Sequence, residues 1–114
     1  SAAYRVWEHS TEDKSVMLMG FECPSEGEAR EILSWSANYW KVSYDNLGYE
    51  TGRGNFPEYG DETEVVKATS GQNVVYSVII RIQNVTATVG TVNLSKSETE
   101  SYCELAVDRI KDQR

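Results

Sequence analysis

The stretch SGQNVVYSVIIRIQNVTATVGTV, residues 70–92, decides the fold of this 114-residue chain. In its first half every second residue is apolar or aromatic, which is the period of a β-strand. These residues are Val74, Tyr76, Val78, Ile80 and Ile82. In its second half one face carries Val85, Ala87, Val89 and Thr91.

A two-residue turn at Gln83-Asn84 would pair Ile82 with Val85 and Ile80 with Ala87, so that the apolar residues of both strands share one side of a hairpin. Asn84 tolerates the positive φ that such a turn needs. The pattern predicts a hairpin that builds a core, with Val78, Ile80 and Val89 buried and Arg81 exposed.

The segments before the hairpin predict two strands, a helix and a further strand. Residues 4–9 alternate, residues 16–23 form a short apolar run, and residues 64–69 lead into the hairpin. Between them Ser25 and Glu28 have the spacing of a helix N-terminal capping box, and Gly48 is a plausible terminator for a helix that ends between residues 39 and 46. The core stripe of this helix is expected to contain Ala29, Ile32, Leu33, Ser36, Trp40 and Tyr44.

Residues 47–61 are rich in glycine and predict a long loop, and Ser97 and Glu100 predict the start of a last helix. Together the segments predict one α+β domain, residues 1–114, in the order β-β-α-β-β-β-α. We expect an antiparallel sheet of about five strands with two helices on one face.

The net charge of −7, from 18 acidic and 11 basic residues, disfavours nucleic acid and anionic membrane surfaces as partners. No apolar run approaches the roughly 20 residues of a membrane span, so we expect no membrane insertion of this domain. The sequence indicates no cofactor.

The two cysteines, Cys23 and Cys103, lie at the starts of the two predicted helices. If both helices cover one face of the sheet, these thiols can approach each other. The sequence leaves two alternatives open, a Cys23–Cys103 disulfide or two buried thiols, and we expect the pair to be bridged or adjacent.

The residues that could carry catalysis or metal binding have no distinctive pattern. His9 is the only histidine and has no obvious partner in its local sequence. The carboxylates of residues 58–64 are clustered, but their spacing is not that of a calcium-binding EF-hand loop. We therefore expect no catalysis and no metal site.

Aromatic residues are unusually dense in residues 35–59. Trp40 and Tyr44 fall on the core stripe of the helix, whereas other aromatics need a different partner. This partner is either the long loop or a ligand or protein bound at the surface. The hypothesis of a binding surface assigns it to Trp35, Tyr39, Tyr49, Phe56 and Tyr59.

Two short motifs occur within this layout of two strands, a helix, a sheet and a closing helix. One is Gly60-Asp61-Glu62, just before the second half of the chain, and the other is Arg81 to Asn84 in the hairpin. In these features the chain resembles bacterial envelope lipoproteins and the extracellular sensor domains of actinobacterial serine/threonine kinases. The resemblance implies an extracellular or cell-envelope, non-catalytic domain that binds a protein or a small-molecule ligand. The alternatives are a small cone-shaped α+β enzyme with an acid–base cleft and a cystatin-like protease inhibitor that uses hairpin tips.

Overall fold

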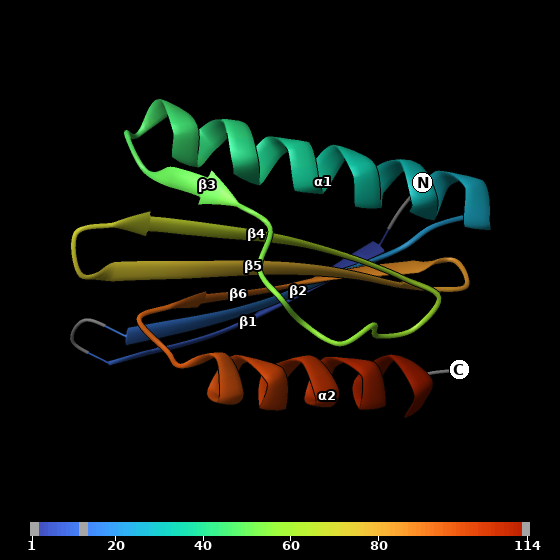
Figure 1. Cartoon of the computed structure of the whole chain (residues 1–114). Coiled ribbons are helices and arrows are strands. Elements are labelled where there is room, and N and C mark those ends of the chain that lie inside the picture. Colours follow the sequence, from blue (N-terminus) through green and yellow to red (C-terminus); the bar gives the residue numbers. More distant parts are fainter. Residues whose placement is uncertain (1–2, 12–13, 113–114) are drawn as a thin grey trace.

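In the part of the chain that the structure describes, six antiparallel strands form one sheet with a helix on each side (Figure 1). The structure is a computed structural model that describes the backbone of residues 3–11 and the backbone and side chains of residues 14–112. In chain order the elements are β1 (Ala3–Thr11), β2 (Lys14–Glu22), α1 (Glu26–Asn46), β3 (Glu50–Gly52), β4 (Glu62–Ser70), β5 (Asn73–Ile82), β6 (Val85–Val92) and α2 (Lys96–Asp112). The strand order across the sheet is β1-β2-β6-β5-β4-β3.

The predicted α+β class and antiparallel sheet are confirmed, and the predicted order of elements holds with one addition. The short strand β3 lies within the segment predicted as a loop and pairs with the end of β4. The last helix begins at Lys96, because Ser95 and Glu98 form the capping box two residues before the pair that the sequence suggested.

The register of the β5–β6 hairpin is as predicted. Ile82 pairs with Val85, Ile80 with Ala87 and Val78 with Val89. The positive φ falls on Gln83, at 52°, and not on Asn84. The predicted two-residue turn therefore forms, but the residue with positive φ lies one position earlier than expected.

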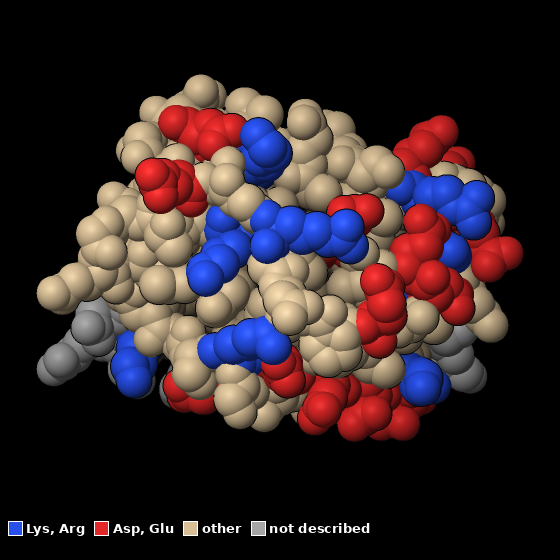
Figure 2. All heavy atoms as spheres, viewed as in Figure 1, with Lys and Arg blue, Asp and Glu red and all other residues tan. Residues whose placement is uncertain are grey.

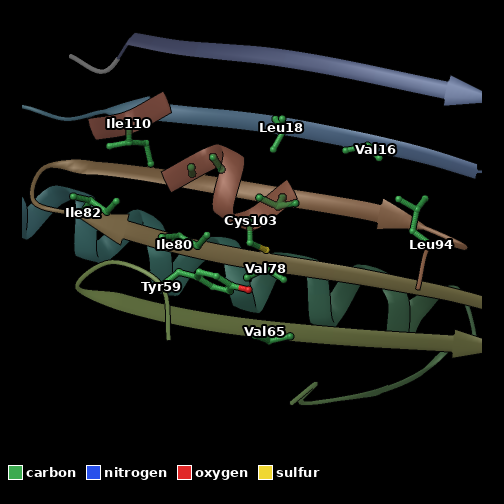
Figure 3. Close-up of a cluster of buried hydrophobic side chains, with 13 residues drawn as sticks. Val16, Leu18, Tyr59, Val65, Val78, Ile80, Ile82, Leu94, Cys103 and Ile110 are labelled. Atoms are coloured by element: carbon green, nitrogen blue, oxygen red, sulfur yellow. The ribbon is translucent and has the colours of Figure 1, made fainter. Parts of the chain in front are cut away.

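The two helices lie on opposite faces of the sheet, so the expectation that both cover one face was wrong (Figure 1). The side chains of Cys103, Ala106 and Ile110 in α2 pack with Val78 and Ile80 in one core cluster (Figure 3). On the other face the Thr86 hydroxyl donates a 2.6 Å hydrogen bond to the Ala29 carbonyl of α1. Successive residues of a strand point to opposite faces, so Thr86 and Ala87 identify the α1 face and the α2 face of the sheet.

Strand β5 is buried on both faces, which explains one further correction. Val75 and Ile79 are buried beneath α1, on the face opposite the one that the sequence pattern predicted as core. Arg81 shares this face, so the prediction that Arg81 is exposed was wrong, and its side chain is only 6% exposed. A strand that lies between two layers must bury whatever residue its second face carries.

Of the two alternatives that the sequence left open, the structure has two buried thiols: Cys23 and Cys103 are both free and buried, and no disulfide joins them. Cys103 lies in the core between α2 and the sheet. Cys23 lies in the connection from β2 to α1, where its backbone N–H donates to the Asn84 carbonyl at the tip of the hairpin. The disulfide was one of the alternatives because both helices were placed on one face, and they are not.

The segment between β3 and β4 crosses the edge of the sheet and covers part of the α2 face (Figure 1). Tyr59 belongs to the core cluster of that face, and Phe56 packs edge-on against Tyr76 with ring centroids 5.1 Å apart. The segment returns to β4 at Gly60, which has a φ of +64°. No helix of the described residues is both long enough and apolar enough to cross a lipid bilayer.

Gly60 and Gly71 offer a matched test of this close approach. Both have φ near +60°, but a Cβ at Gly60 would lie 2.5 Å from Ile82 Cγ1 and 2.7 Å from the Arg81 carbonyl oxygen, whereas a Cβ at Gly71 meets nothing within 4 Å. We expect Gly71→Ala to lower the free energy of unfolding by about 1–2 kcal/mol through backbone strain alone. Gly60→Ala should cost about 1–3 kcal/mol more because the added methyl overlaps β5.

Urea denaturation of both variants measures this difference. Equal losses for Gly60→Ala and Gly71→Ala would contradict the close packing of the segment against the end of β5.

Candidate functional site

Helix α1 packs on the sheet through a stripe of buried residues, two of which are small. Ser25 begins the helix by accepting a hydrogen bond from the Glu28 N–H, and Gly48, with φ of +86°, follows its end. The fully buried positions of the helix are Ala29, Leu33 and Ser36. The small side chains of Ala29 and Ser36 let the helix lie close to the sheet, and Ile32, Trp40 and Tyr44 of the predicted core stripe are half-buried.

One flank of α1 carries large apolar side chains that remain exposed. Trp35 is 64% exposed, Tyr39 47% and Val42 45%. Their spacing of four and three residues places them on one side of the helix, beside the half-buried Ile32. The Trp35 and Tyr39 rings stack with centroids 5.1 Å apart. We call these four residues the aromatic flank.

The opposite flank of α1 is polar and is tied to one side of the sheet. Arg30 donates a 3.0 Å hydrogen bond to Glu62 of β4, and Asp45 accepts one from Thr51 of β3. At 100° per residue, the aromatic flank lies on the other side of the helix from Arg30 and Asp45. The aromatic flank therefore faces away from β3 and β4, toward β6 and β2.

The sheet surface beside the aromatic flank is apolar and only partly covered. Met17, Met19 and Phe21 of β2 point to the α1 face and are half-buried. Their neighbours on the α2 face of the same strand, Val16 and Leu18, are only 5% and 6% exposed. We call the three half-buried residues the β2 strip.

Gly90 of β6 shapes the β2 strip. A Cβ built at this position would lie 3.6 Å from the Met17 methyl, so Met17 lies along the sheet above Gly90. The flat floor that results holds a flexible thioether side chain, which can adapt its shape to a partner.

The five residues predicted as one binding surface do not all come together. Trp35 and Tyr39 form the exposed pair, and Tyr49 is linked to them through the rings of Trp40 and Tyr44, with 5.3 Å between the Tyr44 and Tyr49 centroids. Phe56 and Tyr59 lie on the α2 face, and Tyr59 is part of the core. The grouping rested on proximity in sequence, which the crossing of residues 53–61 to the other face breaks.

Sequence reasoning did not identify Met17 and Met19 as surface residues. The stretch VMLM, residues 16–19, looks uniformly apolar, and only the chemical difference between Val16 or Leu18 and the two flexible methionines separates its faces. That difference is too small to identify a partly open face without knowledge of where α1 lies.

A second group of side chains, charged ones, surrounds the buried Arg81. Its Nε atom donates a 2.7 Å hydrogen bond to Glu62, and its Nη1 atom donates one of 2.9 Å to the Gln83 carbonyl. Asp61 and Glu26 each place a carboxylate oxygen 3.7 Å from the same Nη1 atom. At this end of the molecule, where α1 begins, basic side chains are surrounded by acidic ones (Figure 2).

The Arg81 cluster joins the two short motifs that carried the family resemblance. The Asp61 N–H donates to the Arg81 carbonyl, and the Asp61 carboxylate accepts from the Gln83 N–H at 2.7 Å. Hydrogen bonds from Arg81 and then Arg30 lower the pKa of Glu62 below its ordinary value. The cluster thus fastens α1, the start of β4 and the hairpin turn to one another, which is a structural role.

A third group lies on the α2 face, where Lys67 lies over Tyr76 and Lys96 over Phe56, with the ammonium nitrogens 5.8 and 5.6 Å from the ring centroids. Basic side chains cross the middle of this side of the molecule (Figure 2). Both lysines already contact aromatic rings of the chain, so the arrangement stabilises the cover over the α2 face.

Two buried groups with titratable side chains, Cys103 and Tyr59, have strongly raised pKa values. Burial, followed by the effects of Glu100 and Glu104, raises the pKa of Cys103 to about 12, and burial likewise raises that of Tyr59 to about 12. Both groups are protonated at neutral pH, and a protonated thiol is a weak nucleophile.

Among the described residues, no group of three or more His, Cys, Asp or Glu side chains is placed to hold a metal ion. The side chain of His9, the candidate acid or base, lies outside the described part of the chain.

No protein-family model, curated protein or solved structure matches the chain.

The role of Arg81 predicts a contrast between two arginines. Arg81→Ala removes a buried cation and its packing, so the free energy of unfolding at pH 7 should fall by about 2–4 kcal/mol. Arg30→Ala should cost less than about 1 kcal/mol, because Arg30 binds the same carboxylate from an exposed position.

The effect of Arg81→Ala should also depend on pH. The pKa of Glu62 in the folded state is depressed below its ordinary value of 4.5, so its stabilising contribution is present above that pH and is lost as pH falls through the lower folded-state pKa. The stability difference between wild type and Arg81→Ala should therefore shrink in acid. Urea denaturation from pH 7 to 3 measures it, and a difference that is constant with pH would contradict the assignment.

Proposed function

We propose that this protein is a non-catalytic binding domain that contacts a partner protein through the aromatic flank of α1. The observation that carries the proposal is the stacked pair Trp35 and Tyr39, which is held on a rigid helix and left largely exposed. Tyrosine and tryptophan bring a large contact area and lose little side-chain entropy on binding, and they are enriched where protein interfaces derive most of their affinity.

The shape of the surface favours a protein over a small molecule. A small-molecule site buries most of its ligand between walls of the protein. Here the two rings lie on the outer side of a helix, and the apolar surface continues onto the β2 strip. A partner protein can cover both parts at once. The combined apolar surface is larger than the single exposed apolar residues that are normal on soluble proteins.

The alternative functions find less support in the geometry. A cystatin-like inhibitor needs a free hairpin tip, but the Asn84 side chain donates to the Cys23 carbonyl and the Gln83 N–H donates to Asp61. An enzyme needs an available acid–base pair, and the carboxylates that gather in the described chain surround Arg81.

We place the domain in the extracellular space or the cell envelope, and the support for this is the family resemblance. The N-terminus of the full gene tests it, because a signal peptide with a lipobox cysteine would supply the route and the anchor.

The double variant Trp35→Ala with Tyr39→Ala tests the binding role. Both side chains are exposed, so each truncation should change the free energy of unfolding by no more than about 0.5–1 kcal/mol. Capture of the partner from an extract of the source cells should be lost, because the aromatic anchors are gone. Leu105→Ala, which removes an exposed apolar side chain on α2, is the matched control and should retain capture.

Two results would contradict the proposal. A loss of several kcal/mol in the double variant would show that the rings stabilise the fold. Equal capture by the wild type and the double variant would show that the aromatic flank is not the contact surface.

A further inference from the structure

We infer that the partner docks as an amphipathic α-helix with basic borders, which lies beside α1 across the β2 strip. This inference rests on the proposed function and specifies the partner of the same surface.

The dimensions of the sheet leave room for one more helix on the α1 face. Six strands at about 4.8 Å spacing span about 24 Å from the first to the last, whereas one helix is about 10 Å wide. Helix α1 makes its main contacts with β3, β4, β5 and β6. The α1 face of β2 is therefore the part of the sheet where a second helix fits.

The exposed surface has two parts that such a helix can contact. The aromatic flank forms the side, and the β2 strip forms the floor, with Met17 lying flat above Gly90. A helix presents apolar residues every three or four positions and can touch both surfaces at once. A strand added to the outer edge at β1 would pair through its backbone and would not reach Trp35.

Charge at the border of the surface selects the partner. Glu28 and Glu31 are exposed and lie one turn before Ile32 and Trp35 on α1. The two basic residues of α1, Arg30 and Lys41, lie on the opposite flank, where they pair with Glu62 and Asp45. A helix with lysine or arginine along its borders is complementary to this acidic margin.

A second copy of this chain is a poor occupant of the same surface. Each copy carries a net charge of −7, so two copies repel each other as they approach. Like charges placed opposite each other across an interface weaken it and reduce its specificity.

The methionines provide a direct probe, because Met17 and Met19 are the only two in the chain and both belong to the β2 strip. Protein labelled with ¹³C at the methionine methyl groups gives two NMR signals. The ligands are two synthetic peptides of about 18 residues with the same leucine and tryptophan face, which an α-helix of that length presents along about five turns. One peptide has lysine along both borders and the other has glutamate.

We expect the lysine peptide to shift both methyl signals and to bind about tenfold more tightly than the glutamate peptide at low salt. The Trp35→Ala, Tyr39→Ala double variant should lose this binding. In the charge-swapped variant Glu28→Lys with Glu31→Lys, the preference should reverse or fall below about threefold.

Each other outcome overturns the inference. Shifts that persist in the double variant would place the peptide away from the aromatic flank, and equal binding of the two peptides would remove the charge selection. Shifts that appear on concentrating the protein alone would show a second copy on the surface. If neither peptide shifts the methyl signals while the double variant still loses partner capture, the helical partner is wrong and the proposed function stands.

Discussion

The burial of strand β5 on both faces is the constraint on which the rest of the structure depends. Val78 and Ile80 pack toward α2, while Val75 and Ile79 pack toward α1. A strand with two apolar faces needs a layer on each side, so the two helices cannot share one face. The same constraint forces Arg81 into the interior at the end of the strand, where carboxylates from three segments compensate its charge.

Helix α1 covers one face of β5 but leaves the candidate surface, the aromatic flank and the β2 strip, open. The helix lies over the side of the sheet that holds β3 to β6 and packs through Ala29, Leu33 and Ser36. Its large residues, Trp35 and Tyr39, have no place in that contact and remain on the flank. The α2 face differs, because residues 53–61 cross to it and add Phe56 and Tyr59 to its cover.

The structural features that depend on local sequence pattern were predicted correctly. The register of the β5–β6 hairpin follows from period-two alternation and a two-residue turn, and the start of α1 follows from Ser25. The face of each helix could not be predicted, because residues 74–82 satisfy the pattern of a half-buried strand even though both faces are buried. The Cys23–Cys103 disulfide, one of the two alternatives, and the single aromatic surface failed for the same reason: each assumed that neighbours in sequence, or two helices, share a face.

Hydroxyl-radical footprinting of the free protein tests whether the α1 flank beside β2 is open to solvent. Trp35 and Trp40 lie on the same helix and have the same intrinsic reactivity, but Trp35 is 64% exposed and Trp40 is half-buried. Mass spectrometry of the oxidised chain at two protein concentrations gives the rate for each residue. We expect Trp35 to be oxidised several times faster than Trp40 at both concentrations. Equal protection of Trp35 and Trp40 would contradict this expectation.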